Sequence, residues 1–420
     1  MASVPPALPH RPVRDELRSP WSPVLEGRQR DRALAVATEV ADVLATWPAT
    51  GTSLAGGSAG RALLHARFAD DPQQRELARD ALHHAVTSLR PTGGPASLHL
   101  GAAGTGFVLA HLAGDLLDDR DRCGGVDRAL TSLLERRRWT GRLDLMRGLV
   151  GIGVYALERL EVPAGPQLLA RVVEHLAEAA LRAPEGRTWW TPPDQLPDRT
   201  RRASPDGHVD LGIAHGVPGT IALLADACAA DVADGIARPL LRDAVAWLLA
   251  TSVRDDRELA SWWTGEPAPA PARTAWCYGE PAVAVALLRA ARAAGEPTWE
   301  DAALLLARRA AARPVGASGV TDAGLCHGSA GLGLVFTRLH QATGDASLRD
   351  AAQRWFHHAL EQRLPGTGVA GFTAQHEDGR HPDPSLLTGA AGVSLALHAA
   401  ATTTEPCWDR VLLLSTAVTR

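Results

Sequence analysis

The sequence predicts an all-α fold in which a ring of seven inner helices is surrounded by seven outer helices. Three observations lead to this prediction. A short glycine motif recurs seven times along the 420 residues, each copy continues into a mostly apolar run, and amphipathic segments lie between the copies. Runs of β-branched residues are short, so few strands are expected.

The recurring motif is a glycine, two further residues, and a glycine or alanine, followed by small and aliphatic residues. Glycine gives the backbone freedom for a tight turn. Pro218 and Pro281 suit the first turn of the following helix, where a missing N–H costs nothing. The runs behind the turns are apolar on nearly all sides, which predicts buried inner helices. The leading glycines are Gly57, Gly101, Gly148, Gly216, Gly279, Gly328 and Gly389.

The segments between the copies predict the outer helices. Their apolar residues recur at three- and four-residue spacing with charges on the other face, which is typical of helices exposed on one side. A linear solenoid would have polar repeats at both ends, but the last run, residues 391–400, is as apolar as the middle ones, so a closed ring is favoured. The amphipathic segments include 30–47, 72–89, 167–183, 301–313 and 345–364.

The chain reads as one domain with a short extension. Residues 1–29 are expected to be a poorly ordered N-terminal extension, and residues 30–420 a single helical domain. Two longer intervals, 186–208 and 251–276, combine Pro, Asp and Gly with tryptophan pairs at 189–190 and 262–263. They are predicted to be loops over one mouth of the ring, with the tryptophans as apolar walls.

Composition excludes several classes of function. The formal net charge of -4 provides no basic field for a phosphate backbone, so nucleic-acid binding is not expected. Apolar runs are too short for a signal peptide or a membrane-spanning helix, which favours a cytoplasmic location. An odd number of widely spaced cysteines favours metal binding or catalysis over a disulfide framework. These cysteines are Cys123, Cys228, Cys277, Cys326 and Cys407.

Two of the turns carry residues that suit a metal. Cys277 and Cys326 occupy nearly the same place in adjacent copies, and His327 follows the second cysteine. Two thiolates and an imidazole are good ligands for Zn²⁺ and leave the fourth tetrahedral position open, as in catalytic sites. The alternative is two small core cysteines and a capping histidine. The other three cysteines lie outside the turn register and are expected to be filler or surface residues.

Proton transfer requires further groups near the same mouth. His215, in the equivalent turn of the fourth copy, is the best candidate for a general acid and base, and Asp144 is a carboxylate that would orient it. Arg273 would stabilise an oxyanion or hold a substrate carboxylate. Each has a structural alternative: His215 as a capping residue, and Asp144 and Arg273 as surface charges.

The turn sequences WCYG (276–279) and CHG (326–328), together with AHG (214–216), resemble those of the lanthionine synthetase C-like family, the lanthipeptide cyclases. The resemblance extends over about residues 30–402. It implies an α/α toroid of fourteen helices and a Zn²⁺ held by Cys277, Cys326 and His327. It also implies that His215 is the acid and base, that Asp144 is its partner, and that Arg273 and Tyr278 support the reaction. Trp276 and Tyr278 are then expected to shape the surroundings of Cys277.

The reaction that the resemblance implies is the addition of a peptide cysteine thiolate to the β-carbon of dehydroalanine or dehydrobutyrine in the same peptide. Protonation of the resulting enolate leaves a thioether ring. The expected substrate is a precursor peptide with a leader, dehydrated by a separate enzyme, because the chain is too short to include a dehydratase domain. A complex with that dehydratase and a transporter would place the protein at the inner membrane face.

Three alternatives remain open. Relatives of these cyclases add glutathione or another small thiol to dehydroamino acids in proteins. An α/α-toroid glycosidase would use two carboxylates, for which Asp144 and Glu280 are candidates. A helical ring that only binds peptides would leave the Cys/Cys/His group structural or idle. Bound zinc would argue strongly against the glycosidase.

Overall fold

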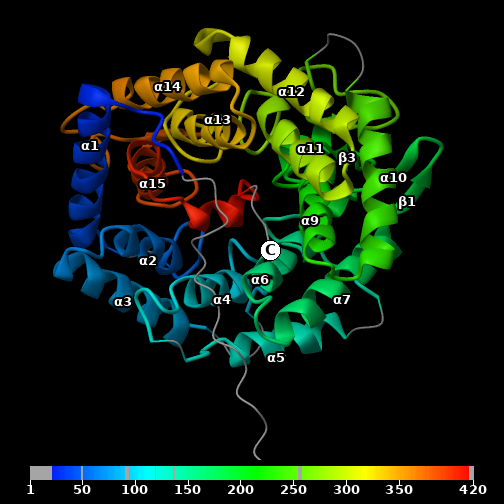
Figure 1. The fold of residues 1–420 in the computed structure, drawn as a ribbon, viewed down its shortest axis with the longest axis horizontal. Coiled ribbons are helices and arrows are strands. Elements are labelled where there is room, and N and C mark those ends of the chain that lie inside the picture. The colour runs from blue at the N-terminus through cyan, green and yellow to red at the C-terminus, as the bar shows by residue number, and fades with distance from the viewer. Residues whose placement is uncertain are drawn as a thin grey trace, which may run out of the picture.

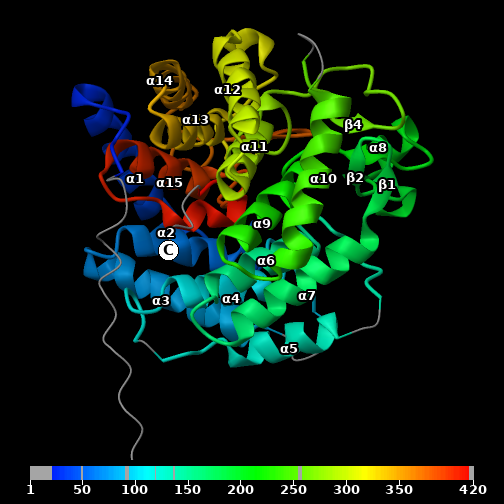
Figure 2. The same ribbon diagram turned by 45° about the vertical axis from the view of Figure 1, so that its right-hand side comes forward.

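The computed structural model describes residues 21–48, 51–89, 94–118, 120–135, 138–253 and 258–415. Over these residues the helices form a ring of two layers, shown face-on in Figure 1 and turned in Figure 2. Each predicted turn glycine is the N-cap of an inner helix. The inner helices are α2 (Ser58–Arg67), α4 (Ala102–His111), α6 (Leu149–Glu158), α9 (Val217–Ala229), α11 (Glu280–Ala294), α13 (Ser329–Thr343) and α15 (Ala390–Ala401).

The outer layer follows the amphipathic segments and closes the ring. Helix α1 packs against α15, and the backbone N–H groups of Val24 and Leu25 donate to the carbonyl of Ala400, so the two ends of the repeat meet. The predicted toroid of seven inner and seven outer helices is confirmed for the described residues. The outer helices are α1 (Gly27–Thr46), α3 (Pro72–Thr87), α5 (Gly124–Leu134), α7 (Ala164–Ala179), α10 (Asp234–Ser252), α12 (Pro297–Ala312) and α14 (Ala346–Glu361).

The turn glycines are required because the chain folds back on itself before each inner helix. A Cβ atom at Gly216 would lie 1.9 Å from the carbonyl oxygen of Asp210. Gly279 has a φ of 89°, in the left-handed region that side chains disfavour. Pro218 and Pro281 lie in the first turns of α9 and α11, as predicted.

Backbone hydrogen bonds join the turns of neighbouring copies and place them on one face of the ring. We number the positions of each turn backward from its glycine. The residue immediately before the glycine is at the first position, the one before that at the second, and so on to the sixth. The N–H of second-position Ala55 donates to the carbonyl of second-position His99 at 2.9 Å. Equivalent bonds run from Cys277 to Cys326 at 3.1 Å, from Cys326 to Leu387 at 2.8 Å, and from Leu387 to Ala55 at 3.1 Å.

Short strands occur only in the connecting loops of the described chain. β1 (Leu181–Ala183) pairs with β2 (Gly186–Thr188), β3 (Val209–Asp210) with β4 (Trp262–Trp263), and β5 (Ala374–His376) with β6 (Gly379–His381), all antiparallel. The β3–β4 pair draws the two long loops together beside the fourth turn. The first of these loops also holds η1 (Pro193–Gln195) and α8 (Asp198–Ala203).

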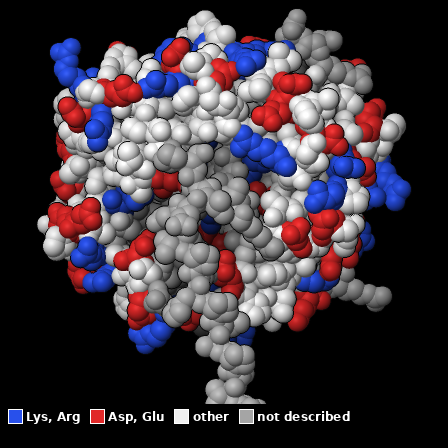
Figure 3. Space-filling model, in the orientation of Figure 1, with Lys and Arg blue, Asp and Glu red and all other residues white. Residues whose placement is uncertain are grey.

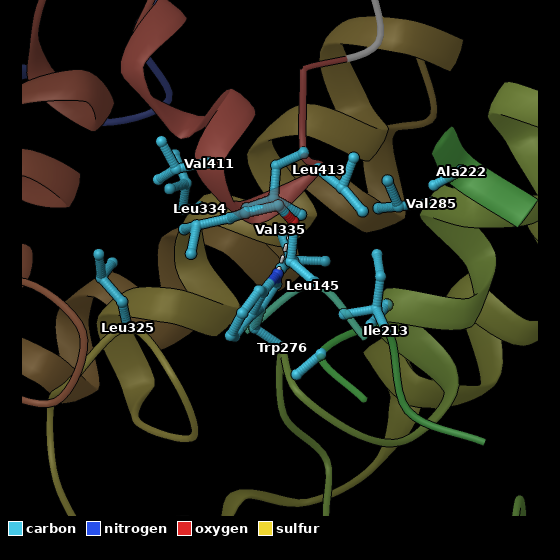
Figure 4. Close-up of a cluster of buried hydrophobic side chains, with 14 of the residues drawn as sticks. Leu145, Ile213, Ala222, Trp276, Val285, Leu325, Leu334, Val335, Val411 and Leu413 are labelled. Atoms are coloured by element: carbon cyan, nitrogen blue, oxygen red, sulfur yellow. Dashed lines mark hydrogen bonds between the residues drawn. The ribbon is translucent and has the colours of Figure 1, made fainter. Parts of the chain in front are cut away.

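The C-terminal segment fills the centre of the ring, where η3 (Cys407–Leu412) appears in red in Figure 1. Arg338 of α13 forms a buried ion pair with Asp409, and Arg410 pairs with Glu158 of α6. Beyond η3, Leu413 packs in an apolar cluster with Trp276, shown in Figure 4. The described residues of this segment therefore contribute to the packed core of the ring.

The described part of the predicted N-terminal extension, residues 21–29, contacts the ring. Trp21 is buried, its indole N–H donates to the carbonyl of Ala399 at 2.9 Å, and the Arg338 guanidinium lies over its ring. Residues 1–20 lie outside the described part of the chain. On the face drawn in Figure 3, acidic and basic side chains are interspersed. Among the described helices, none combines the length and apolarity needed to cross a membrane.

Candidate metal centre and active site

The turns of the fifth and sixth copies bring two thiols and an imidazole together. Cys277 and Cys326 share the second position, and the backbone bond between them sets the two cysteines side by side. His327 follows at the first position of the sixth copy. The ligand atoms of these three residues all lie within 4.8 Å of one another. Their sulfur and nitrogen donors, their number and their spacing fit a Zn²⁺ with one open coordination position.

The electrostatics of this group favour one thiolate. A hydrogen bond with the Cys326 thiol lowers the pKa of Cys277 to about 5 against the opposing effect of burial, with support from His327 and Arg273. The pKa of Cys326 is raised well above its usual value, because its thiol proton is held by Cys277 and a second buried negative charge would lie beside the first. The hydrogen bond to Cys277 raises the pKa of His327. A divalent cation would replace these protons.

His215 and Asp144 are also brought together. The Nδ1 atom of His215 lies 3.5 Å from Oδ2 of Asp144, whose Oδ1 accepts a hydrogen bond from the backbone N–H of Arg147 at 2.6 Å. The imidazole retains 41% of its exposure, whereas the carboxylate is buried. Burial lowers the pKa of His215, but Asp144, Asp210 and Cys277 outweigh that effect and leave the pKa raised. The imidazole is thus suited to carry and return a proton near neutral pH.

Tyr278 faces the same site, while its neighbour Trp276 does not. The Tyr278 ring centroid lies 6.3 Å from that of His215, and burial, together with Asp210, raises the pKa of Tyr278 well above its usual value. Trp276 was expected to shape the surroundings of Cys277. Instead its indole is fully buried in the ring centre and donates to the carbonyl of Leu412 at 2.8 Å.

Arg273 is exposed, whereas Glu280 is fully buried. Arg273 is exposed and close enough for its charge to lower the pKa of Cys277. Glu280, the second carboxylate of the glycosidase alternative, is fully buried at the start of α11 and forms an ion pair with Arg313 at 2.9 Å. Because Glu280 is committed to this pair inside the protein, it does not serve as a catalytic carboxylate beside Asp144.

Sequence reasoning missed two buried aspartates at the sixth position. Asp210, in the fourth copy, accepts a hydrogen bond from the Tyr278 hydroxyl at 2.8 Å and lies 3.7 Å from His208. Asp322, in the sixth copy, lies 4.0 Å from the Nε2 atom of His327. A signal was present in the repeat, because the seventh copy has Asp383 at the same position.

A depression next to His215 is walled by the first tryptophan loop. Its lining includes Leu143, Trp190, Thr191 and Gln195 together with His215. Trp190 is 37% exposed, whereas Trp189 is anchored by its indole N–H, which donates to the carbonyl of Leu176. The other loop lies behind this wall, where Trp262 stacks on the buried His208. The first loop therefore places apolar surface beside the candidate acid and base.

A family model and the solved structure of nisin cyclase agree with this architecture. The family model of the lanthionine synthetase C-like protein matches residues 48–413. The solved structure of nisin cyclase aligns with a TM-score of 0.71 and 18% identity, covering 92% of this chain and 97% of that chain, which shows the shared fold. An unsaturated glucuronyl hydrolase from Streptococcus agalactiae aligns with a TM-score of 0.49 and 11% identity, covering 92% of this chain and 95% of that chain. No curated protein matches the chain in sequence.

Proposed function

Because the chain belongs to the lanthionine synthetase C-like family, we propose that it is a zinc-dependent lanthipeptide cyclase. In this reaction, cysteine thiols of a peptide add to its dehydroalanine or dehydrobutyrine residues and form (methyl)lanthionine thioethers. The observation that carries the proposal is the convergence of Cys277, Cys326 and His327, whose ligand atoms lie within 4.8 Å of one another on the mouth that also holds His215.

Cys277, Cys326 and His327 would hold the metal. A Zn²⁺ with these ligands supplies a Lewis acid that lowers the pKa of a substrate thiol at its open position. Two thiolate ligands and a neutral imidazole leave the ion without excess positive charge. The already low pKa of Cys277, about 5, favours the ligand form of at least one cysteine at neutral pH.

His215 would move the proton. Addition removes a proton from the substrate thiol, forms the bond between sulfur and the β-carbon, and places a proton on the α-carbon, so the reaction leaves the proton count unchanged. The imidazolium of His215 can supply the α-carbon proton, and its neutral form can take up the thiol proton. Asp144 and Asp210 favour the protonated form, since both raise the pKa of His215.

Arg273 and Tyr278 would support the enolate that forms between these steps. The exposed Arg273 guanidinium supplies positive charge beside the site. The Tyr278 hydroxyl donates to Asp210, which fixes the phenol ring next to His215. The depression walled by Trp190 gives the peptide an apolar surface against which to rest. Preorganised charge of this kind stabilises a transition state without reorganisation during the reaction.

The substrate in this proposal is a dehydrated precursor peptide with its leader. A separate dehydratase would supply it, and a transporter would receive the product, in a cytoplasmic complex that can lie at the inner membrane face. The same residues would also serve the addition of glutathione to a dehydrated protein. A peptide containing both a cysteine and a dehydroalanine, offered together with glutathione, separates the two reactions by the mass of the product.

The proposal is tested first by the zinc content of the purified protein. We expect about one zinc per chain, lost in Cys277→Ala and in Cys326→Ala, because each variant leaves only two ligands. Cys228→Ala is the matched control, since Cys228 is a buried cysteine of α9 outside the turn register. The same four proteins are then assayed for loss of the free thiol from a dehydrated peptide. A metal-free wild type prepared without chelator would contradict the proposal.

A further inference from the structure

We propose that Asp322 is a positioning residue that orients His327 toward the two thiols. This inference rests on the proposed metal site and extends it to a residue outside the ligand set. Asp322 lies at the sixth position of the sixth copy and retains only 2% of its exposure. A carboxylate this deeply buried requires partners, because burial without them carries a large desolvation penalty.

The Asp322 carboxylate is held from two sides. Its Oδ1 atom accepts a hydrogen bond from the backbone N–H of Gly324 at 3.1 Å, within the same turn. Its Oδ2 atom accepts one from the backbone N–H of Gln375 at 2.9 Å, at the centre of β5. The hairpin β5–β6 therefore reaches the candidate metal site through its main chain, and the carboxylate has one fixed direction.

That direction places a negative charge against one edge of the His327 ring. Oδ2 of Asp322 lies 4.0 Å from Nε2 of His327, an ion-pair distance. A carboxylate beside Nε2 favours the tautomer that carries its proton there and leaves the lone pair of Nδ1 for a metal. Asp322 would thus set both the tautomer and the ring orientation of this ligand.

The seventh copy has an aspartate at the same position, with a similar hydrogen bond in its turn but no candidate metal ligand. Asp383 also lies at the sixth position, and its Oδ1 atom accepts from the backbone N–H of Ser385, two residues on. Its Oδ2 atom accepts from the hydroxyl of Thr388, which occupies the position of His327. The aspartate at this position therefore supports the turn in both copies. Asp383 also lies near an imidazole, 3.9 Å from Nε2 of His376, but that histidine is outside the candidate ligand group, so what distinguishes Asp322 is its pairing with a ligand of that group.

The test compares zinc affinity of the full chain in Asp322→Asn and Asp383→Asn, measured by competition for zinc with a chromophoric chelator. Loss of a carboxylate that supports a ligating histidine weakens metal binding about 10- to 100-fold, and we expect this for Asp322→Asn. We expect Asp383→Asn to bind zinc like the wild type. Thermal unfolding of both metal-free variants measures the cost to the turn separately from the effect on zinc affinity.

A wild-type affinity in a folded Asp322→Asn variant would overturn the inference. If that variant does not fold, Asp322→Ser replaces it, because a serine hydroxyl can accept the bond from Gly324 while removing the charge. The same loss of affinity supports the inference, and an unchanged affinity overturns it. A wild type that binds no zinc defeats the proposed function, whereas a zinc-binding wild type with an unimpaired variant defeats only the role of Asp322.

Discussion

Two junctions between neighbouring turns have nearly the same backbone and different chemistry. Between the fifth and sixth copies, the N–H of Cys277 donates to the carbonyl of Cys326 at 3.1 Å, and between the seventh and first copies Leu387 donates to Ala55 at 3.1 Å. The first junction carries two thiols, and the second only aliphatic side chains. The repeat thus supplies the same backbone geometry at both junctions, and a few side chains decide which of them can hold a metal.

Position in the repeat does not by itself decide the role of a side chain. His99 of the second copy shares the second position with Cys277, but its Nε2 atom donates to the carbonyl of Val411 at 3.0 Å inside the ring. The segment that fills the ring centre offers this carbonyl, and the imidazole turns toward it. A residue of a type that binds metals therefore serves the core in one copy and the candidate site in another.

The largest expected effect concerns His215, which occupies the first position in the fourth copy. We expect His215→Asn to lower kcat about 10²- to 10⁴-fold, because a positioned acid and base contributes about that much, while zinc content stays unchanged. Thr388→Ala, at the same position in the seventh copy, is the matched control and should keep its activity. Cyclisation of a dehydrated peptide under saturation gives kcat. A His215→Asn variant with full activity would show that the proton comes from another group.

The next largest expected effect is a loss of fold stability at acid pH, caused by the buried His99. Burial lowers the pKa of His99 to about 4, despite the hydrogen bond to Val411, because its Nδ1 atom has no partner and a proton there would be buried and unpaired. The folded state therefore binds fewer protons than the unfolded chain below about pH 6.5. The free energy of unfolding is therefore expected to fall by roughly 3 kcal/mol as the pH drops from about 6.5 toward 4.

The measurement is the free energy of unfolding in urea between pH 7 and 4. His99→Gln is the informative variant, because its amide can still donate to Val411 but does not titrate, and we expect a flatter pH dependence. Both proteins carry Cys277→Ala, so that release of metal does not contribute. Parallel curves for the two proteins would place the acid sensitivity in other groups, among them His398, whose pKa burial also lowers to about 4.

The repeat could be recognised in the sequence because each copy needs the same features, a tight turn followed by a buried helix. All seven glycines are N-caps of inner helices, and the shared register of Cys277 and Cys326 was enough to predict that they meet. Asp210 and Asp322 were missed because they stand in loops ahead of the turns, where an aspartate is ordinary. Only the way the loop folds back directs their carboxylates toward Tyr278 and His327.

The segment in the ring centre was also not predicted, since it follows the last repeat and has no periodicity of its own. Its burial depends on tertiary contacts. Glu158 and Arg338 stand out as charges in apolar inner helices, and each needs a buried partner. Arg410 and Asp409 provide these partners. Charged residues in an otherwise apolar helix were therefore the signal that something else enters the core.

The smallest expected effect tests how tightly neighbouring turns fit. A Cβ atom at Gly212 would lie 2.4 Å from the carbonyl oxygen of Cys277 and 2.8 Å from the Tyr278 ring, whereas one at Gly56 would meet only Ser385 at 3.9 Å. We expect Gly212→Ala to lower the free energy of unfolding by about 1–3 kcal/mol, since overpacking forces the backbone to shift.

Gly56→Ala is the matched control and should change stability by less than about 0.5 kcal/mol, as ordinary surface substitutions do. Urea unfolding measures both. Zinc competition adds a second readout, because a shift of the Cys277 carbonyl also displaces the ligand beside it, so Gly212→Ala should weaken zinc binding and Gly56→Ala should not. Equal stability and equal zinc affinity of the two variants would mean that neighbouring turns can shift to accommodate an added methyl group. The geometry of the candidate metal site would then have to come from the ligands and the metal instead of from the repeat.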